Sequence, residues 1–235
     1  MTEIPDTSPR EQILDAALPH VVFDGWSEEA FRAAVQDSGV DFALARSLFP
    51  KGGIDLAIAF HKRGDAQMIE RLLQEDLSAM RFRDRIASAV RYRLEAVAMF
   101  KEEVRRGTSL FALPHNAAEG ARLIWGTADA IWSTLGDTSE DYNWYTKRAT
   151  LSGVYASVVL FWLGDETEGH EATWEFLDRR IENVMQFEKM KAQVNANPLA
   201  AKFLSGPNWL LSKVRRPMDM PDPDLPGIFR PRGSK

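Results

Sequence analysis

The sequence predicts an all-α protein, a bundle of about nine helices followed by an amphipathic helix near the C-terminus. Apolar residues recur at helical spacing along most of the chain, and capping residues and glycines mark where these segments begin and end. No run alternates apolar and polar residues as a half-buried strand would. Residues 149–163 carry no charge. They number about 15, fewer than the roughly 20 that span a bilayer, so we predict a central helix buried on all sides by the bundle.

Composition limits the classes of function. The chain has 235 residues, of which 45% are hydrophobic and 27% are charged, as in a globular protein of one or two domains. Because it has no cysteine, a disulfide framework and a thiolate metal site are excluded. The net charge of −5 argues against wholesale nucleic-acid binding. The first residues lack the apolar core of a secretory signal and the arginines of a transit peptide, so we expect the cytoplasm as the compartment.

Three short helices are predicted over residues 9–60. Ser8 and Pro9 begin the first, Ser27 caps the second, and the third runs from Asp41 to a stop at Pro50. This arrangement resembles the DNA-binding unit of tetracycline-repressor-type regulators. However, residues 8–60 hold eight acidic and four basic residues. Because phosphate neutralisation supplies nearly all non-specific DNA affinity, we predict that this unit does not bind DNA.

Residues 61–196 are predicted to form a lipid-binding and dimerisation bundle. We expect a break in the first of its helices near Gly64, and a non-helical connector over residues 108–113. One helix carries an arginine-rich face that we interpret as solvated and paired with acids: Arg81, Arg83, Arg85, Arg91 and Arg93. The expected helices cover residues 53–74, 78–106, 114–136, 141–163 and 167–194.

The segment 197–216 has the pattern of a membrane-contact helix. Residues 189–218 contain six basic residues and no acid. An apolar arc lies opposite a basic face, as in helices that lie at a bilayer surface. Packing of the same apolar arc onto the body of the protein remains an alternative. The proline-rich residues 217–235 are expected to be disordered. The candidate membrane-contact residues are Leu199, Phe203, Leu204, Leu210, Leu211, Val214, Lys202 and Lys213.

No catalytic constellation, cofactor motif or metal site is recognisable, so we predict that the protein is not an enzyme. We interpret His61 and His170 as surface or helix-end residues. The large aromatic residues either fill the core or line a pocket for a long apolar ligand. The candidate lipid-binding residues are Trp125, Trp132, Tyr155, Phe161 and Trp162.

Four segments closely resemble a family of ubiquinone-biosynthesis accessory proteins, that of the ninth Coq protein. They are ILDAALPHVVFDGWSEEAFRAAV, SLFPKGGIDLAIAFH, GTADAIWSTLGDTSEDYNWYTKRATLSGVYASVVLFWL and TWEFLDRRIENV. The DYNWYTKR block with the apolar helix after it is the most specific part. The resemblance implies a tetracycline-repressor-like fold that forms homodimers and binds an isoprenoid lipid or quinone intermediate.

The resemblance also implies a task. Family members present membrane-embedded substrate to demethoxyubiquinone hydroxylase, and the docking patch corresponds here to Asp141, Trp144, Tyr145 and Arg148. Lys147 stands where some members have arginine. We expect a bacterial form peripheral on the inner membrane, or a processed eukaryotic form on the matrix side of the mitochondrial membrane. The alternative function is a ligand-responsive transcriptional regulator of the tetracycline-repressor type.

Overall fold

The computed structural model describes residues 8–140 and 142–196. Within these residues the chain forms nine α-helices and two short 3-10 helices and no strand, which confirms the predicted all-α class. The predicted membrane-contact helix and tail, residues 197–235, and Asp141 lie outside the described residues.

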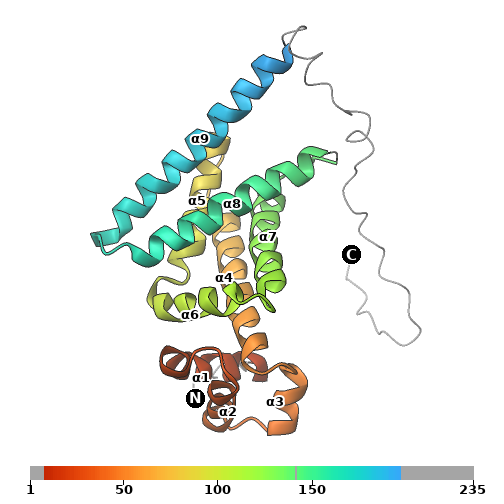
Figure 1. Ribbon diagram of the computed structural model, residues 1–235, viewed down its shortest axis with the longest axis vertical. Coiled ribbons are helices and arrows are strands. Elements are labelled where there is room, and N and C mark those ends of the chain that lie inside the picture. The colour runs from red at the N-terminus through yellow and green to blue at the C-terminus, as the bar shows by residue number, and fades with distance from the viewer. Residues whose placement is uncertain (1–7, 141, 197–235) are drawn as a thin grey trace, which may run out of the picture.

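The three N-terminal helices lie at one end of the long axis (Figure 1). They are α1 (Pro9–Asp24), α2 (Glu28–Ser38) and α3 (Phe42–Leu48), close to the predicted positions. Each begins as expected, because the side chains of Ser8, Ser27 and Asp41 accept a hydrogen bond from a backbone N–H in the first turn. Phe31 and Phe49 are fully buried between them.

The single arginine of α3, Arg46, contacts α2 within the N-terminal unit. Arg46 forms an ion pair with Glu28, and its guanidinium lies 4.5 Å from the ring centroid of Phe31. This cation is therefore engaged within the N-terminal unit, and α3 presents Phe42 and Leu44 to solvent instead, at 45% and 44% exposure.

α4 (Gly53–Gln74) runs from the N-terminal unit into the bundle without a break. The predicted interruption at Gly64 is wrong, because this glycine serves close packing. A Cβ at this position would lie 2.5 Å from Nη1 of Arg93. Gly64 therefore makes room for a buried guanidinium while keeping helical geometry.

The helix predicted over residues 78–106 is two helices, α5 (Phe82–Glu95) and α6 (Lys101–Ala112), joined by η1 (Ala98–Phe100). The predicted connector 108–113 is also wrong, since α6 occupies most of it. The turn between α5 and α6 contains no proline or glycine, so no local sequence signal predicts it. Contacts with residues far away in sequence stabilise it instead. The ring of Phe100 packs edge-on against Phe60 at 5.9 Å, and Lys101 Nζ donates to the carbonyl of Asp165 at 2.6 Å.

The chain continues through α7 (Ala117–Thr134), α8 (Tyr142–Gly164), η2 (Glu168–His170) and α9 (Glu171–Ala196). α8 crosses the bundle beside α7 and α9 (Figure 1). The expectation that α8 is enclosed on all sides is wrong, because one face is open: Ala149 and Gly153 are exposed, and Leu160 is 61% exposed. None of the described helices combines the length and apolarity needed to cross a bilayer.

Candidate functional site

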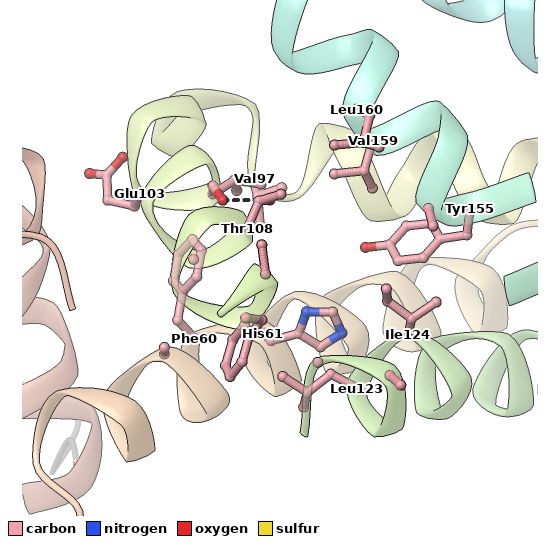
Figure 2. Close-up of a pocket in the computed structure, with 18 of the residues that line it drawn as sticks. Phe60, His61, Val97, Glu103, Thr108, Leu123, Ile124, Tyr155, Val159 and Leu160 are labelled. Carbon is pink, nitrogen blue, oxygen red and sulfur yellow. Dashed lines mark hydrogen bonds between the residues drawn. The ribbon is translucent and has the colours of Figure 1, made fainter. Parts of the chain in front are cut away.

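A cavity of about 450 Å³ lies among α4, α5, α6, α7 and α8 (Figure 2). Its walls are largely apolar, with Phe60 and Val97 on one side and Ile124 and Val159 on the other. The volume lies within the range of pockets that hold one small organic molecule. The turn between α5 and α6 brings α6 across the bundle, so this turn helps to form the cavity.

Small residues and one leucine mark where the cavity meets solvent. Among its lining residues, Ala112, Ala117, Ala121 and Leu160 are exposed. They come from the end of α6, the start of α7 and the second half of α8. The mouth therefore opens beside the outward face of α8, and an apolar chain leaving the cavity would pass over Leu160.

The inner end of the cavity is polar and internally bonded. Arg93, 3% exposed, donates from Nε to Asp65 Oδ1 at 2.6 Å and from Nη2 to the carbonyl of His61 at 3.0 Å. The hydroxyl of Thr127 donates to Asp65 Oδ1 at 2.9 Å and lies 2.9 Å from His61 Nε2. A buried arginine is tolerable in such a place because its charge is matched by a carboxylate.

Beside the charged Arg93, the side chains of His61 and Tyr155 are uncharged at neutral pH. Burial, assisted by the charge of Arg93, lowers the pKa of His61 to about 4. Burial likewise raises the pKa of Tyr155, so its side chain is a phenol. Figure 2 shows the imidazole and the phenol hydroxyl facing the same open space, whereas the carboxyl group of Glu103 points away from it.

A second distinctive region, the aromatic corner, lies where α7 meets the start of α8. We define it as Trp125, Trp144 and Tyr145. The ring centroids of Trp144 and Tyr145 are 4.8 Å apart, and Trp125 lies 5.9 Å from Trp144. Trp144 and Tyr145 are half-buried, so each keeps part of its ring at the surface. Large aromatics of this kind are frequent energetic centres of protein interfaces.

A buried ion network supports the aromatic corner. The guanidinium of Arg148, 2% exposed, lies 4.0 Å from the ring centroid of Trp144 and pairs with Asp129 and Asp137. Asp137 also accepts from Lys147 Nζ at 2.8 Å. Although burial alone would raise the pKa of Asp137, hydrogen bonds from Lys147 and Arg148 lower it to about 2.

Of the five candidate lipid-binding residues, the structure places only Tyr155 at the cavity. Trp125 belongs to the aromatic corner. Trp132 donates from Nε1 to the carbonyl of Lys147 at 3.2 Å. Phe161 stacks on Phe176 at 4.4 Å, and Trp162 is fully buried beneath Lys101. Four of the five therefore do not line this cavity, because large aromatics on several faces of α7 and α8 pack into neighbouring helices.

Of the candidate docking residues, the structure describes Trp144, Tyr145 and Arg148, which lie together at the start of α8. Trp144 and Tyr145 reach the surface, whereas Arg148 lies beneath Trp144 and is not available for direct contact. Sequence reasoning also missed His61 and Arg93 as cavity residues, because both were interpreted as solvated. The signal that could have found them is spacing: His61 and Asp65 are one helical turn apart on α4, next to Gly64.

Within the described part of the chain, no three His, Asp or Glu side chains gather as metal ligands would. Buried acids are instead engaged locally. Asp165 accepts from the hydroxyls of Thr167 and Thr173, which helps to hold the connection between α8 and α9.

Residues 117–188, which include α7, α8 and the aromatic corner, match the COQ9 family model. A Drosophila melanogaster protein named "Ubiquinone biosynthesis protein COQ9, mitochondrial" is 34% identical over 188 residues, covering 78% of this chain and 57% of that protein. The Homo sapiens protein of the same name is 31% identical over 194 residues, covering 80% and 61%. The chain thus spans about three fifths of the length of these relatives.

A solved structure supports the fold. The crystal structure of a TetR transcriptional regulator from Nitrosomonas europaea matches with a TM-score of 0.61 at 20% identity. The match covers 74% of this chain and 95% of the regulator. It confirms the predicted tetracycline-repressor-like fold, and at this identity it shows the fold alone.

Proposed function

Because the chain belongs to the COQ9 family, we propose that it is a lipid-binding accessory protein of ubiquinone biosynthesis. The family resemblance drawn from the sequence is thereby confirmed. In the proposed role the protein holds an isoprenoid lipid or quinone intermediate and offers it to the demethoxyubiquinone hydroxylase. It catalyses no reaction itself. Its place of action is the membrane surface where the quinone is made, on the mitochondrial matrix side or the bacterial inner membrane.

The observation that supports this proposal is the apolar cavity with its mouth beside Leu160. A polyprenyl lipid is almost insoluble in water, so a carrier must shield at least part of it. A cavity of about 450 Å³ takes one end of such a molecule and leaves a long tail outside. The tail would then lie along the exposed apolar side chains of α8 or in the bilayer.

Two further surfaces fit the proposal. Segment 197–216 would place the protein on an anionic bilayer through its apolar arc and lysines. The aromatic corner would dock the hydroxylase through Trp144 and Tyr145, with Arg148 supporting Trp144 from beneath; the docking prediction also includes Asp141, which lies outside the described residues. The TetR-type alternative is not favoured, because the N-terminal unit is acidic and Arg46 is paired within it.

We also propose a homodimer, as the resemblance implies, formed through the first half of the outward face of α8, away from the cavity mouth. This part of the face carries small residues, Ala149 and Gly153, which allow close approach of a second helix. Gly153→Arg should convert the dimer to a monomer in light scattering without unfolding it, since no other atom lies within 4 Å of a Cβ at this position. A monomeric wild type would contradict this part of the proposal.

The test of lipid binding is to fill the cavity. Purified wild-type protein should release an isoprenoid lipid on organic extraction, identified by mass spectrometry. Val159→Trp places an indole in the cavity, because Val159 points into it (Figure 2), and should abolish the extracted lipid. Gln36→Trp adds the same side chain at an exposed position of α2 and should retain it. Wild-type protein free of lipid and unable to take one up would reject the proposal.

Membrane contact has its own test. The full chain should sediment with vesicles containing anionic phospholipid, and a chain ending at residue 198 should not. If the shortened chain still sediments, the membrane contact lies elsewhere in the molecule.

A further inference from the structure

The hydrogen-bonding groups that face the cavity are not all used by the protein. The Thr127 hydroxyl has one proton. Besides His61, it lies beside Asp65 Oδ1 and the carbonyl of Leu123, which can only accept. It also lies beside the hydroxyl of Tyr155, which can donate or accept. Its contact with His61 must therefore be a hydrogen bond donated by Nε2 of His61. A neutral imidazole carries one proton, so Nδ1 of His61 is left as an acceptor.

Tyr155 supplies a complementary group. It comes from α8, opposite His61 on α4, and its hydroxyl points into the open space (Figure 2). A buried phenol both donates and accepts. The inner end of the cavity therefore presents a fixed acceptor and an adjustable hydroxyl, set in walls that are otherwise apolar.

The charges around this end cancel. The cation of Arg93 is matched by Asp65, at 2.6 Å, and two of its nitrogens already donate to protein oxygens. A second anion in the cavity would have to compete with Asp65 for this guanidinium. Burying an ion without a partner is strongly unfavourable, whereas an uncharged polar group needs only hydrogen bonds. This end therefore discriminates by charge.

We infer that the inner end of the cavity binds an uncharged, oxygen-bearing head group of a lipid through His61 and Tyr155, and excludes lipids that end in a carboxylate or phosphate. The inference rests on the proposed lipid binding and names its ligand class. An alcohol, phenol or quinone head fits, because its oxygen accepts from Tyr155 and any hydroxyl it carries donates to His61. The tail leaves through the mouth at Leu160.

Farnesol and farnesoic acid test this inference, since they share a carbon skeleton and differ in the charge of one end. Binding to the full chain at neutral pH is followed through quenching of tryptophan fluorescence, because Trp26 lines the cavity. Wild-type protein should bind farnesol about tenfold or more tightly than farnesoate. Tyr155→Phe keeps the ring and removes the hydroxyl, and should weaken farnesol binding about three- to tenfold while leaving farnesoate binding unchanged.

Two further variants make the result specific. His61→Phe removes the acceptor and should weaken farnesol binding to a similar degree. Ile124→Val removes one methyl group from the apolar wall and should weaken both probes equally.

The outcomes separate the two proposals. Equal affinity of wild-type protein for the two probes overturns the head-group inference and leaves lipid binding standing. Absence of binding to either probe overturns both. Preference for farnesol that both Tyr155→Phe and His61→Phe leave intact shows that the head group lies elsewhere, and also overturns the inference.

Discussion

Arg93 and Arg148 are buried to nearly the same degree, at 3% and 2% exposure, yet they stabilise regions of opposite character. Arg93 pairs with one carboxylate and stands beside a cavity. Arg148 pairs with two carboxylates, those of Asp129 and Asp137, and these three side chains fill the space between α7 and α8 beneath Trp144. The contrast teaches that a buried cation in this fold positions other groups. In the proposals above, the groups that would meet a ligand or partner are its uncharged neighbours: His61 and Tyr155 at the cavity, and Trp144 at the aromatic corner.

The largest effect is expected from removing the cation at the aromatic corner. Arg148→Ala leaves Asp137, whose side chain is 2% exposed, without its main buried partner. Such a change costs about 3–5 kcal/mol in the free energy of unfolding, measured by urea denaturation. Arg91→Ala, which removes an exposed pair with Glu95, should cost less than about 1 kcal/mol. Similar losses in the two variants would contradict the distinction between buried and surface arginines.

The cavity and the aromatic corner should lose stability in different pH ranges as the solution is acidified. The folded state lowers the pKa of His61 from 6.5 to about 4, so the unfolded chain binds a proton first. The contribution of neutral His61 to the free energy of unfolding is complete above pH 6.5. It is lost as the pH falls to about 4, which lowers the free energy of unfolding by about 3 kcal/mol. His61→Gln should remove this part of the pH dependence, as followed by thermal unfolding. An unchanged profile would show that His61 does not titrate in this way.

At the aromatic corner the same reasoning gives a lower window. The pKa of Asp137 falls from 3.8 to about 2, so its contribution is complete above pH 3.8 and disappears as the pH falls to about 2. The expected loss is about 2 kcal/mol, and Asp137→Asn should lack it. Losses of the two groups in the same pH range would erase the predicted difference between the regions.

A smaller effect is expected from crowding Arg93. Gly64→Ala places a methyl group against the guanidinium, which must move away from Asp65, and should cost about 1–3 kcal/mol. Gly126→Ala on α7 meets no atom within 4 Å and should stabilise the helix by about 0.5–1 kcal/mol. If both variants are stabilised, the packing of Arg93 against Gly64 is looser than the geometry indicates.

The smallest effect on stability, and the largest on association, belongs to Trp144. Trp144→Ala removes a half-buried ring and should cost about 1 kcal/mol of stability. Binding to the purified hydroxylase should weaken by more than about 2 kcal/mol, measured by calorimetry. Phe42→Ala, at an exposed position of α3, serves as the matched control and should bind normally. Undiminished binding of the Trp144 variant would remove the aromatic corner from the interface.

Local signals predicted most of the helices, because caps and stop residues act within a few positions. Ser8, Ser27 and Asp41 begin their helices as expected. The turn between α5 and α6 could not be predicted, since it depends on Phe100 meeting Phe60 and on Lys101 reaching the carbonyl of Asp165, far away in sequence. The cavity depends on that turn.

The site was predicted less well for a related reason. The sequence pattern around a tryptophan on a buried helix is the same whether the side chain lines a pocket or packs against a neighbouring helix. The sequence therefore could not show that Trp125, Trp132 and Trp162 lie away from this cavity. A charged residue on a helix is expected to be solvated when no partner is evident in the sequence. The ion pair of Arg93 with Asp65 joins two different helices, so the sequence does not show it. Tyr155, a lipid-binding candidate chosen among the aromatic residues of the bundle, does line the cavity. Trp144, a docking candidate implied by the family resemblance, is half-buried at the start of α8.

The unbroken course of α8 sets a fixed spacing between the two regions. Trp144 and Leu160 are separated by sixteen positions of one helix, or about 24 Å along its axis. Under the proposed function, a hydroxylase docked at the aromatic corner would receive the lipid only if the lipid moved along α8 over this distance. α8 thus fixes the distance between the aromatic corner and the cavity mouth, and one added helical turn between Trp144 and Leu160 would increase it by about 5.4 Å.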